Sequence, residues 1–83
     1  MTFSYGIVQI INLLVAENAQ VVGRAVNEIA KEMPSGSLLV SVKRGDRKLI
    51  PHGDTIIFPG DFVSIILDRE NIEDIYILFQ SDR

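Results

Sequence analysis

The spacing of hydrophobic residues along the chain predicts an order of strands and helices. Residues 7–16 form an apolar run rich in β-branched side chains, which favours a strand that is buried on both faces or lies at an interface. A helix over the same run is the alternative. Farther along, the spacing lengthens to that of an amphipathic helix of about three turns, which Pro34 cannot continue. One side of this predicted helix carries Val22, Val26, Ile29 and Met33.

The middle of the chain alternates apolar and polar residues, as half-buried strands do. Residues 38–44 show this alternation, and it places Arg44 on the same face as Val42. Gly45 and Asp46 follow, and glycine tolerates the positive φ of a tight turn. We therefore expect a β-hairpin with a short return strand over residues 47–50.

A second turn introduces the next alternating segment. Pro59 and Gly60 suit positions i+1 and i+2 of a type II turn. Residues 62–67 then alternate, but their second face is too apolar to be left in water. Because a small chain also leaves much of its surface exposed, this face and the run 7–16 predict a homodimer or higher oligomer.

The last element is a predicted helix that begins at Asn71, a good N-cap residue, with Glu73 and Asp74 near the positive end of its dipole. Its core-facing stripe would carry Ile72, Ile75, Tyr76 and Phe79. The predicted order is β-α-β-β-β-α. It defines one α+β module over residues 1–83, with a mostly antiparallel sheet and two amphipathic helices.

Composition narrows the classes of function. The chain has 83 residues, room for one small domain, and 47% of them are hydrophobic. Eight Lys and Arg against 11 Asp and Glu give a net charge of -3, which argues against nucleic acid or an acidic membrane as partner. The run 7–16 is too short to cross a membrane. The absence of cysteine suits the reducing cytoplasm.

Candidate chemistry is sparse. His52 is the only histidine and there is no cysteine, so a zinc site lacks ligands and no metal is expected. No G-x-S-x-G turn is present, and we expect no catalytic residues and no enzyme activity. The aspartates at predicted turns are expected to bind local backbone amides, and these are Asp46, Asp54 and Asp61.

Basic residues flank the predicted hairpin turn, namely Lys43, Arg44, Arg47 and Lys48. A solvated hairpin tip is one interpretation of this cluster. Contact with an anion or phosphate is the other, and Arg44 is its best candidate because a guanidinium forms a planar fork of donors.

Four segments in this order resemble the TrkA C-terminal domain, also called the RCK C-lobe or TrkA-C domain. They are residues 21–29, 39–46, 50–55 and 58–63, which read VVGRAVNEI, LVSVKRGD, IPHGDT and FPGDFV. The family shows a V-G-[KR]-x-[LV] helix start, an I-x-R-x-G hairpin, a P-x-x-D-T loop and a G-D-x-[LIV] strand entry. This chain departs from the pattern at Val42, where the family has isoleucine. The resemblance covers about residues 13–79.

The resemblance implies a cytoplasmic regulatory, ligand-binding and oligomerisation module of a potassium or other monovalent cation transport system. The system would be a Trk or Ktr channel or a cation antiporter, and ligand binding would be coupled to its gating. The implied partners are a Rossmann-like TrkA N-terminal domain or subunit and a membrane cation transporter at the inner face of the membrane. The chain has no G-x-G-x-x-G motif, so it is either a fragment or a separate subunit. A purely structural oligomerisation domain without a small-molecule ligand is the alternative.

The resemblance also implies a ligand site. In some members, cyclic di-AMP lies in the dimer interface against the hairpin strand and the proline loop that follows it. The matching positions here are Arg44, Pro51 and His52. An ordinary salt bridge is the other interpretation of Arg44.

Overall fold

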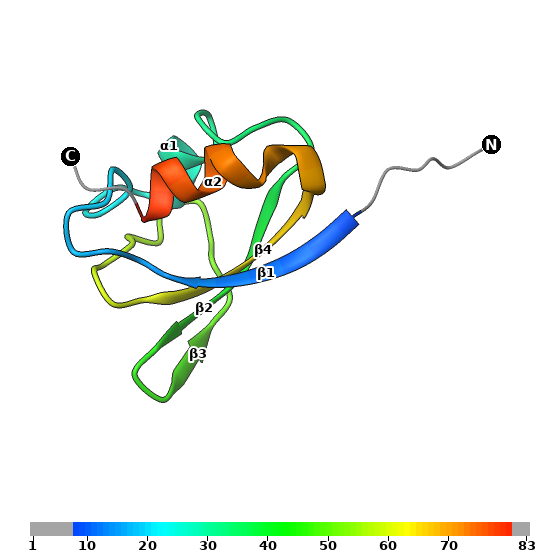
Figure 1. Cartoon of the computed structure of the whole chain (residues 1–83). Helices are drawn as coiled ribbons and strands as arrows, with labels where there is room; N and C mark the ends of the chain where they lie inside the picture. The colour runs from blue at the N-terminus through cyan, green and yellow to red at the C-terminus, as the bar shows by residue number, and fades with distance from the viewer. Residues whose placement is uncertain (1–7, 81–83) are drawn as a thin grey trace.

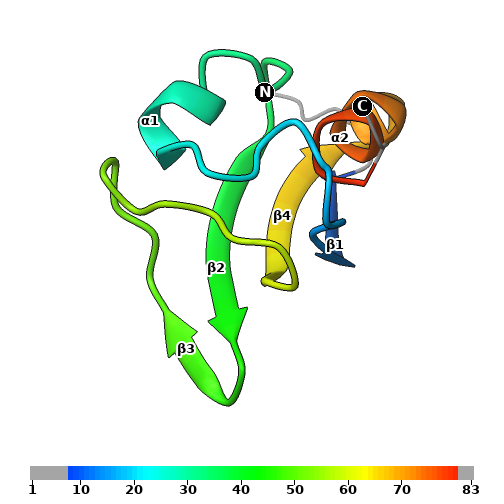
Figure 2. The ribbon, with the colours of Figure 1, turned by 90° about the vertical axis from the view of Figure 1, so that its left-hand side faces the viewer.

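A computed structural model describes residues 8–80. It shows a four-stranded antiparallel sheet of order β1-β4-β2-β3. Both helices lie on the same side of the sheet, and the hairpin extends away from the body (Figures 1 and 2). The predicted α+β order is confirmed, with a short 3-10 helix added before the last helix. The elements are β1 (Val8–Leu14), α1 (Val26–Ile29), β2 (Leu38–Arg44), β3 (Arg47–Leu49), β4 (Phe62–Asp68), η1 (Arg69–Asn71) and α2 (Ile72–Phe79).

The core fills the space between the sheet and α2. Every second residue of β4 is buried, as the alternation predicts, and Phe79 of α2 packs over them without solvent exposure. The end of α2 is also tied to the end of β1. The backbone N–H of Ala16 donates to the carbonyl of Phe79 at 3.0 Å, and the side chain of Gln80 donates to the carbonyl of Leu14 at 3.1 Å.

The run 7–16 forms a strand, as predicted, and Ile7 lies outside the described residues. Burial on both faces is wrong for the single chain, because β1 is an edge strand and buries only the side that faces the helices; the alternative, a face at an interface, stays a prediction. The predicted stripe of α2 needs a correction. In α2, Tyr76 is 41% exposed, whereas Leu78 is buried. The apolar stripe of α2 is therefore rotated toward Leu78 compared with the prediction.

The predicted helix over residues 22–33 is wrong in length, because α1 is a single turn. Hydrogen bonds to the segment before β4 compete with helical bonding. The N–H of Gly23 donates to the carbonyl of Ile57 at 2.8 Å, and that of Val26 donates to the carbonyl of Thr55 at 2.8 Å. Gly23 also has a φ of +82°, outside the helical region. The apolar face survives, with Ile29 buried.

The two predicted turns are confirmed. Gly45 has a φ of +63° between β2 and β3, where Arg44 pairs with Arg47. Gly60 has a φ of +85°, and the N–H of Asp61 donates to the carbonyl of Phe58 at 3.2 Å, as in a type II turn. The N–H of Gly60 also donates to the carbonyl of Val15 at 2.9 Å, so this turn is fixed to the chain that follows β1.

Gly60→Ala should lower the free energy of unfolding by about 1 kcal/mol or more, because a left-handed backbone disfavours any Cβ. The added Cβ would meet nothing within 4 Å, so the cost is conformational. Gly53→Ala is the matched control, since its Cβ would make an ordinary contact with Asn27 at 3.5 Å. Urea denaturation of both variants measures the difference. Equal midpoints for Gly60→Ala and the wild type would show that the turn conformation is misassigned.

Candidate functional site

Arg44 is the predicted site residue with the most contacts. It is the last residue of β2 and lies on the same face as buried Val42, whereas its neighbour Lys43 is exposed on the other face. The alternation in the sequence predicted this orientation. The Arg44 side chain is 36% exposed, so it lies between the core and the solvent.

Asp61 binds the guanidinium of Arg44 in a bidentate ion pair. The Nε atom donates to Oδ1 and Nη2 donates to Oδ2, both at 2.8 Å. Asp61 is only 1% exposed, and its Oδ2 also accepts the N–H of Phe58 at 2.9 Å. Both carboxylate oxygens are therefore occupied, as a buried charge requires. Asp61 has the predicted turn role, together with a long-range partner that the sequence did not reveal.

Two further contacts hold the guanidinium in place. Nη2 donates to the carbonyl of Ile56 at 2.9 Å, and Cζ lies 4.5 Å from the centre of the Phe58 ring. A cation over an aromatic face is attracted by the ring quadrupole. The sequence analysis missed Phe58 and Ile56 as partners, because only folding brings this loop beside the end of β2. The salt-bridge interpretation of Arg44 is thus borne out within the single chain.

Burial by itself would raise the pKa of Asp61. The hydrogen bonds from Arg44 and Phe58 and the positive charge of Arg44 outweigh burial, so the pKa of Asp61 lies below its ordinary value. The hydrogen bond with Asp61 correspondingly raises the pKa of Arg44. The pair is therefore ionised at neutral pH, and Asp61 is unsuited to act as a general base.

Pro51 and His52 lie in the loop after β3. His52 is exposed and Pro51 is half-buried. The N–H of His52 donates to Oγ1 of Thr55 at 2.9 Å, and the N–H of Thr55 returns to the carbonyl of His52 at 3.0 Å, which closes a local turn. Between residues 8 and 80, no side-chain hydrogen bond or ion pair joins Arg44 to Pro51 or His52. The single chain does not itself connect these predicted site residues.

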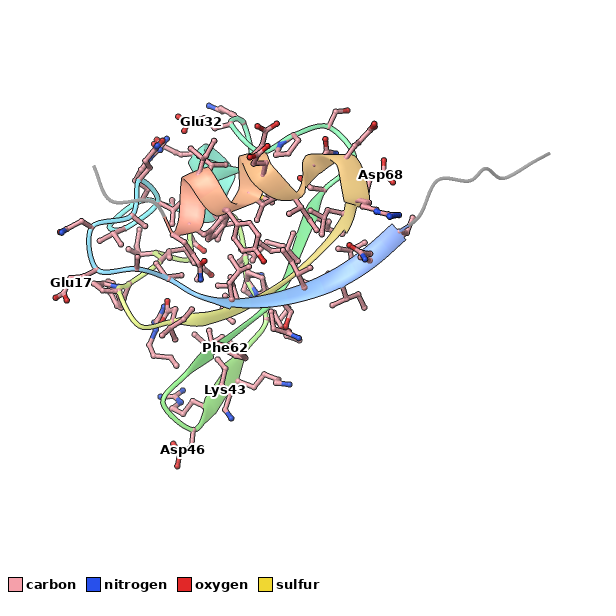
Figure 3. The ribbon with its side chains drawn as sticks, in the orientation of Figure 1. Glu17, Glu32, Lys43, Asp46, Phe62 and Asp68 are labelled. Carbon is pink, nitrogen blue, oxygen red and sulfur yellow. The ribbon has the colours of Figure 1, made fainter. Side chains whose placement is uncertain are left out.

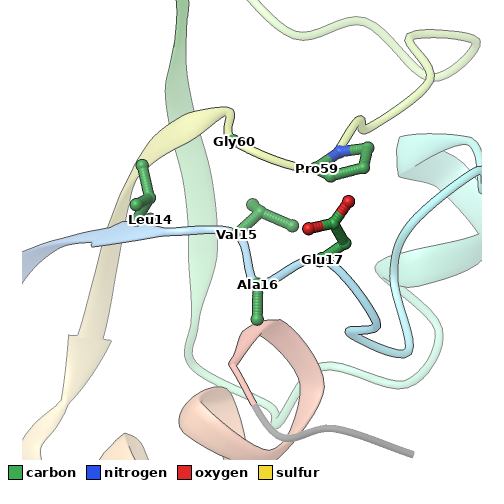
Figure 4. Close-up of a pocket in the computed structure, with 6 residues that line it drawn as sticks. All are labelled: Leu14, Val15, Ala16, Glu17, Pro59 and Gly60. Carbon is green, nitrogen blue, oxygen red and sulfur yellow. The ribbon is translucent and has the colours of Figure 1, made fainter.

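The described residues also contain a shallow, open cavity of about 350 Å³ beside the Gly60 turn (Figure 4). None of the predicted site residues lines it. Its lining residues are Leu14, Val15, Ala16, Glu17, Pro59 and Gly60. Glu17 is the only ionisable side chain among them, so the cavity offers an anion no cationic partner.

Neither a metal cluster nor a membrane-spanning helix is found between residues 8 and 80. No three His, Cys, Asp or Glu side chains there are grouped so that they could hold a metal ion. No helix in this part of the chain is long and apolar enough to cross a membrane.

The fold, the hairpin and the loop that leads to Asp61 together define a known class of domain. The sequence model of the TrkA-C domain matches residues 10–80. The chain belongs to the TrkA-C domain family, and the predicted resemblance is confirmed. Domains of this family are typically regulatory in potassium uptake systems.

Two relatives are Trk potassium uptake proteins. The Trk system potassium uptake protein TrkA of Halomonas elongata is 38% identical over 65 residues, which is 77% of this chain and 14% of that protein. The TrkA homolog of Archaeoglobus fulgidus is 34% identical over 73 residues, which is 88% of this chain and 16% of that protein. The chain therefore spans only about one seventh of the length of these relatives.

A solved structure has the same fold. It is the RCK_C domain dimer of S. agalactiae BusR in complex with c-di-AMP, with a TM-score of 0.73 and 17% sequence identity. The likeness covers 84% of this chain and 88% of that one. At this identity it shows the fold alone.

Arg44→Ala should lower the free energy of unfolding by about 1–3 kcal/mol, because it leaves the buried Asp61 carboxylate without its cationic partner. Partial exposure of Arg44 keeps the loss below that of a fully buried pair. Arg47→Ala, at the exposed position opposite in the hairpin, should change stability by less than about 0.5 kcal/mol. Thermal and urea unfolding compare the two. Equal losses of unfolding free energy in the two variants would mean that the ion pair contributes no more to stability than an exposed surface charge does.

The depressed pKa of Asp61 predicts an acid dependence of stability. Because the folded state favours the ionised carboxylate, its contribution is present above the ordinary pKa of about 4 and is lost as the pH falls below it. The free energy of unfolding, measured from pH 6 to pH 2, should fall as this contribution is lost. In Asp61→Asn, the free energy of unfolding should depend less on pH over the same range. Glu32→Gln is the control, since its ion pair with Arg24 is exposed and screened by solvent. A larger flattening in Glu32→Gln would contradict the assignment.

Proposed function

We infer that this chain is a cytoplasmic regulatory module of a potassium or other monovalent cation transport system of the Trk or Ktr type. The single observation that carries this proposal is membership of the TrkA-C family over residues 10–80, supported by two relatives named for potassium uptake. Because the chain spans about one seventh of those relatives, we assign ion transport to other segments or subunits. The proposed partners are a Rossmann-like TrkA N-terminal domain and a membrane cation transporter.

The chemistry of the site suits regulation better than catalysis. The buried carboxylate of Asp61 accepts hydrogen bonds at both oxygens and has a lowered pKa, so it offers no base to a substrate. Arg44 is held by Asp61, by the carbonyl of Ile56 and by the Phe58 ring. Because these contacts already hold the guanidinium in one position, it loses little conformational freedom when it binds an anion. We therefore assign the module a binding role, with ligand occupancy coupled to gating.

The proposed ligand site consists of Arg44, Pro51 and His52 from two copies of the chain, and the proposed ligand is a cyclic dinucleotide such as cyclic di-AMP. Nη1 of Arg44 donates no hydrogen bond within the described residues, so its N–H groups remain available to a phosphate oxygen. Pro51 offers a rigid apolar surface to a base, and exposed His52 offers a polar contact. The S. agalactiae domain of the same fold, a dimer in complex with c-di-AMP, supports this choice of ligand.

Asp61 compensates the positive charge of Arg44 at this site. Two copies of Arg44 near a dimer axis would repel each other if both charges were uncompensated. Because each is neutralised by its own Asp61, that repulsion is small. Affinity for the ligand would then come from directed donors and from contacts with the base. The same ion pair favours the alternative, a structural oligomerisation domain, because it already gives Arg44 a role without any ligand.

Isothermal titration calorimetry of the dimer with cyclic di-AMP tests the site. We expect heat from the wild type. The affinity should be at least about tenfold weaker for His52→Ala, which removes a polar contact, and for Arg44→Lys, because lysine lacks the planar fork of donors. Arg47→Ala is the matched control for a hairpin charge and should bind like the wild type. Circular dichroism checks that Arg44→Lys stays folded, since its ion pair with Asp61 is altered as well. A folded wild-type dimer that releases no heat would favour the structural alternative.

A further inference from the structure

Asp61 connects the guanidinium of Arg44 to the segment that follows β1. Its carboxylate holds the guanidinium through two hydrogen bonds of 2.8 Å and accepts the N–H of Phe58 at 2.9 Å. The carbonyl of the same residue accepts the N–H of Val15 at 2.8 Å. Asp61 is only 1% exposed, and closely packed residues have little room to shift. A displacement of its side chain is therefore transmitted to its backbone contact.

The Gly60 turn adds further hydrogen bonds to the same network. The N–H of Gly60 donates to the carbonyl of Val15 at 2.9 Å, and the N–H of Asp61 donates to the carbonyl of Phe58 at 3.2 Å. Val15 thus both donates a hydrogen bond to this region and accepts one from it. The φ of +85° at Gly60 gives the turn a distinct backbone state. Opening of the turn would break several of these hydrogen bonds together.

The cavity beside the turn is lined by the two segments that this network joins. Figure 4 shows Pro59 and Gly60 across the cavity from residues 14–17. Within residues 8–80, no side-chain hydrogen bond or ion pair joins any lining residue to Arg44. Asp61 supplies the connection, because it binds Arg44 on one side and Val15 on the other. The shape of the cavity therefore depends on how Asp61 holds the turn.

A ligand on Arg44 would strengthen this network. The Arg44 side chain is 36% exposed, and its Nη1 donates no hydrogen bond within the described residues. An anion bound to Nη1 leaves both hydrogen bonds to Asp61 in place and adds an anchor to the guanidinium. The bound guanidinium then restricts Asp61, and with it the Gly60 turn. By thermodynamic reciprocity, a closed turn binds the anion more tightly than an open one.

We propose that Asp61 is a positioning residue that couples occupancy of Arg44 to the Gly60 turn and to the cavity beside it. Ligand binding stabilises the closed turn, and the wall of the cavity formed by residues 59–60 is the surface that responds. The inference rests on the proposed function for the ligand at Arg44. It adds the route of the coupling and the surface that the coupling reaches.

Calorimetric titration with cyclic di-AMP tests the coupling through a residue outside the proposed ligand site. Gly60→Ala disfavours the left-handed turn and should weaken the affinity at least about fivefold. Gly36→Ala is the matched control, because Gly36 has a similar φ of +87°. Its added Cβ would lie 3.2 Å from Oδ2 of Asp68, and Figure 3 shows Asp68 and the cavity residue Glu17 at opposite ends of the molecule. The control should keep its affinity within about twofold of the wild type, because a general loss of stability does not weaken binding by a chain that stays folded.

Amide hydrogen exchange without ligand tests the route itself. In Arg44→Ala, the N–H groups of Val15 and Gly60 should exchange at least about tenfold faster than in the wild type, after division by the change at Ile29. The N–H of Ile29 is the reference because it donates to the carbonyl of Ala25, outside this network. Equal acceleration at all three N–H groups would show a general loss of stability and would overturn the coupling.

Arg24→Ala is the matched control for the exchange experiment. Arg24 also forms a bidentate ion pair, in which its two Nη atoms donate to Glu32 at 3.1 and 2.8 Å. Neither residue contributes to the hydrogen bonds of Asp61. The exchange of Val15 and Gly60 in this control should therefore stay within about twofold of the wild type.

The possible failures are distinguishable. A folded wild type that releases no heat overturns the proposed ligand, and amide exchange then decides on the coupling alone. If the wild type releases heat but Gly60→Ala binds no more weakly than Gly36→Ala, the coupling is wrong and the proposed function stands. If circular dichroism shows that Gly60→Ala does not fold, the exchange of Val15 and Gly60 in Arg44→Ala decides.

Discussion

The ion pair between Arg44 and Asp61 joins segments that are distant in the chain. Arg44 ends β2, and Asp61 lies between the Gly60 turn and β4. The carbonyl of Asp61 also accepts the N–H of Val15, so the same residue fixes the end of the first strand. A buried carboxylate needs such partners in order to stay ionised. The contact therefore ties the loop before β4 to the end of β2, where the hairpin begins.

The same ion pair bears on function because it gives Arg44 a fixed position. A guanidinium already held by a carboxylate, a carbonyl and an aromatic ring loses little freedom when it meets a ligand. It also has little net charge left to attract one. Specificity at this site would thus depend on directed hydrogen bonds and on the surface of the proline loop.

The sheet faces two environments, and this asymmetry links fold to assembly. The inner face meets α2 and forms the core around Ile65 and Phe79. The side that points away from the helices leaves several large apolar residues exposed within the described residues, among them Ile10, Leu14 and Phe62. Exposed apolar residues gathered on one face of a sheet mark a surface suited to association.

Local signals in the sequence determined the strands, the two turns and the family. Alternation predicted β2 and β4 and the face of Arg44, and glycine chemistry predicted the Gly45 and Gly60 turns, because these features depend on residues close together in the chain. Only the tertiary structure decided the rest. Backbone bonds from residues 53–57 shortened α1, packing turned Leu78 inward in place of Tyr76, and folding brought Asp61 to Arg44. Each of these outcomes results from contacts between segments whose meeting no local pattern encodes.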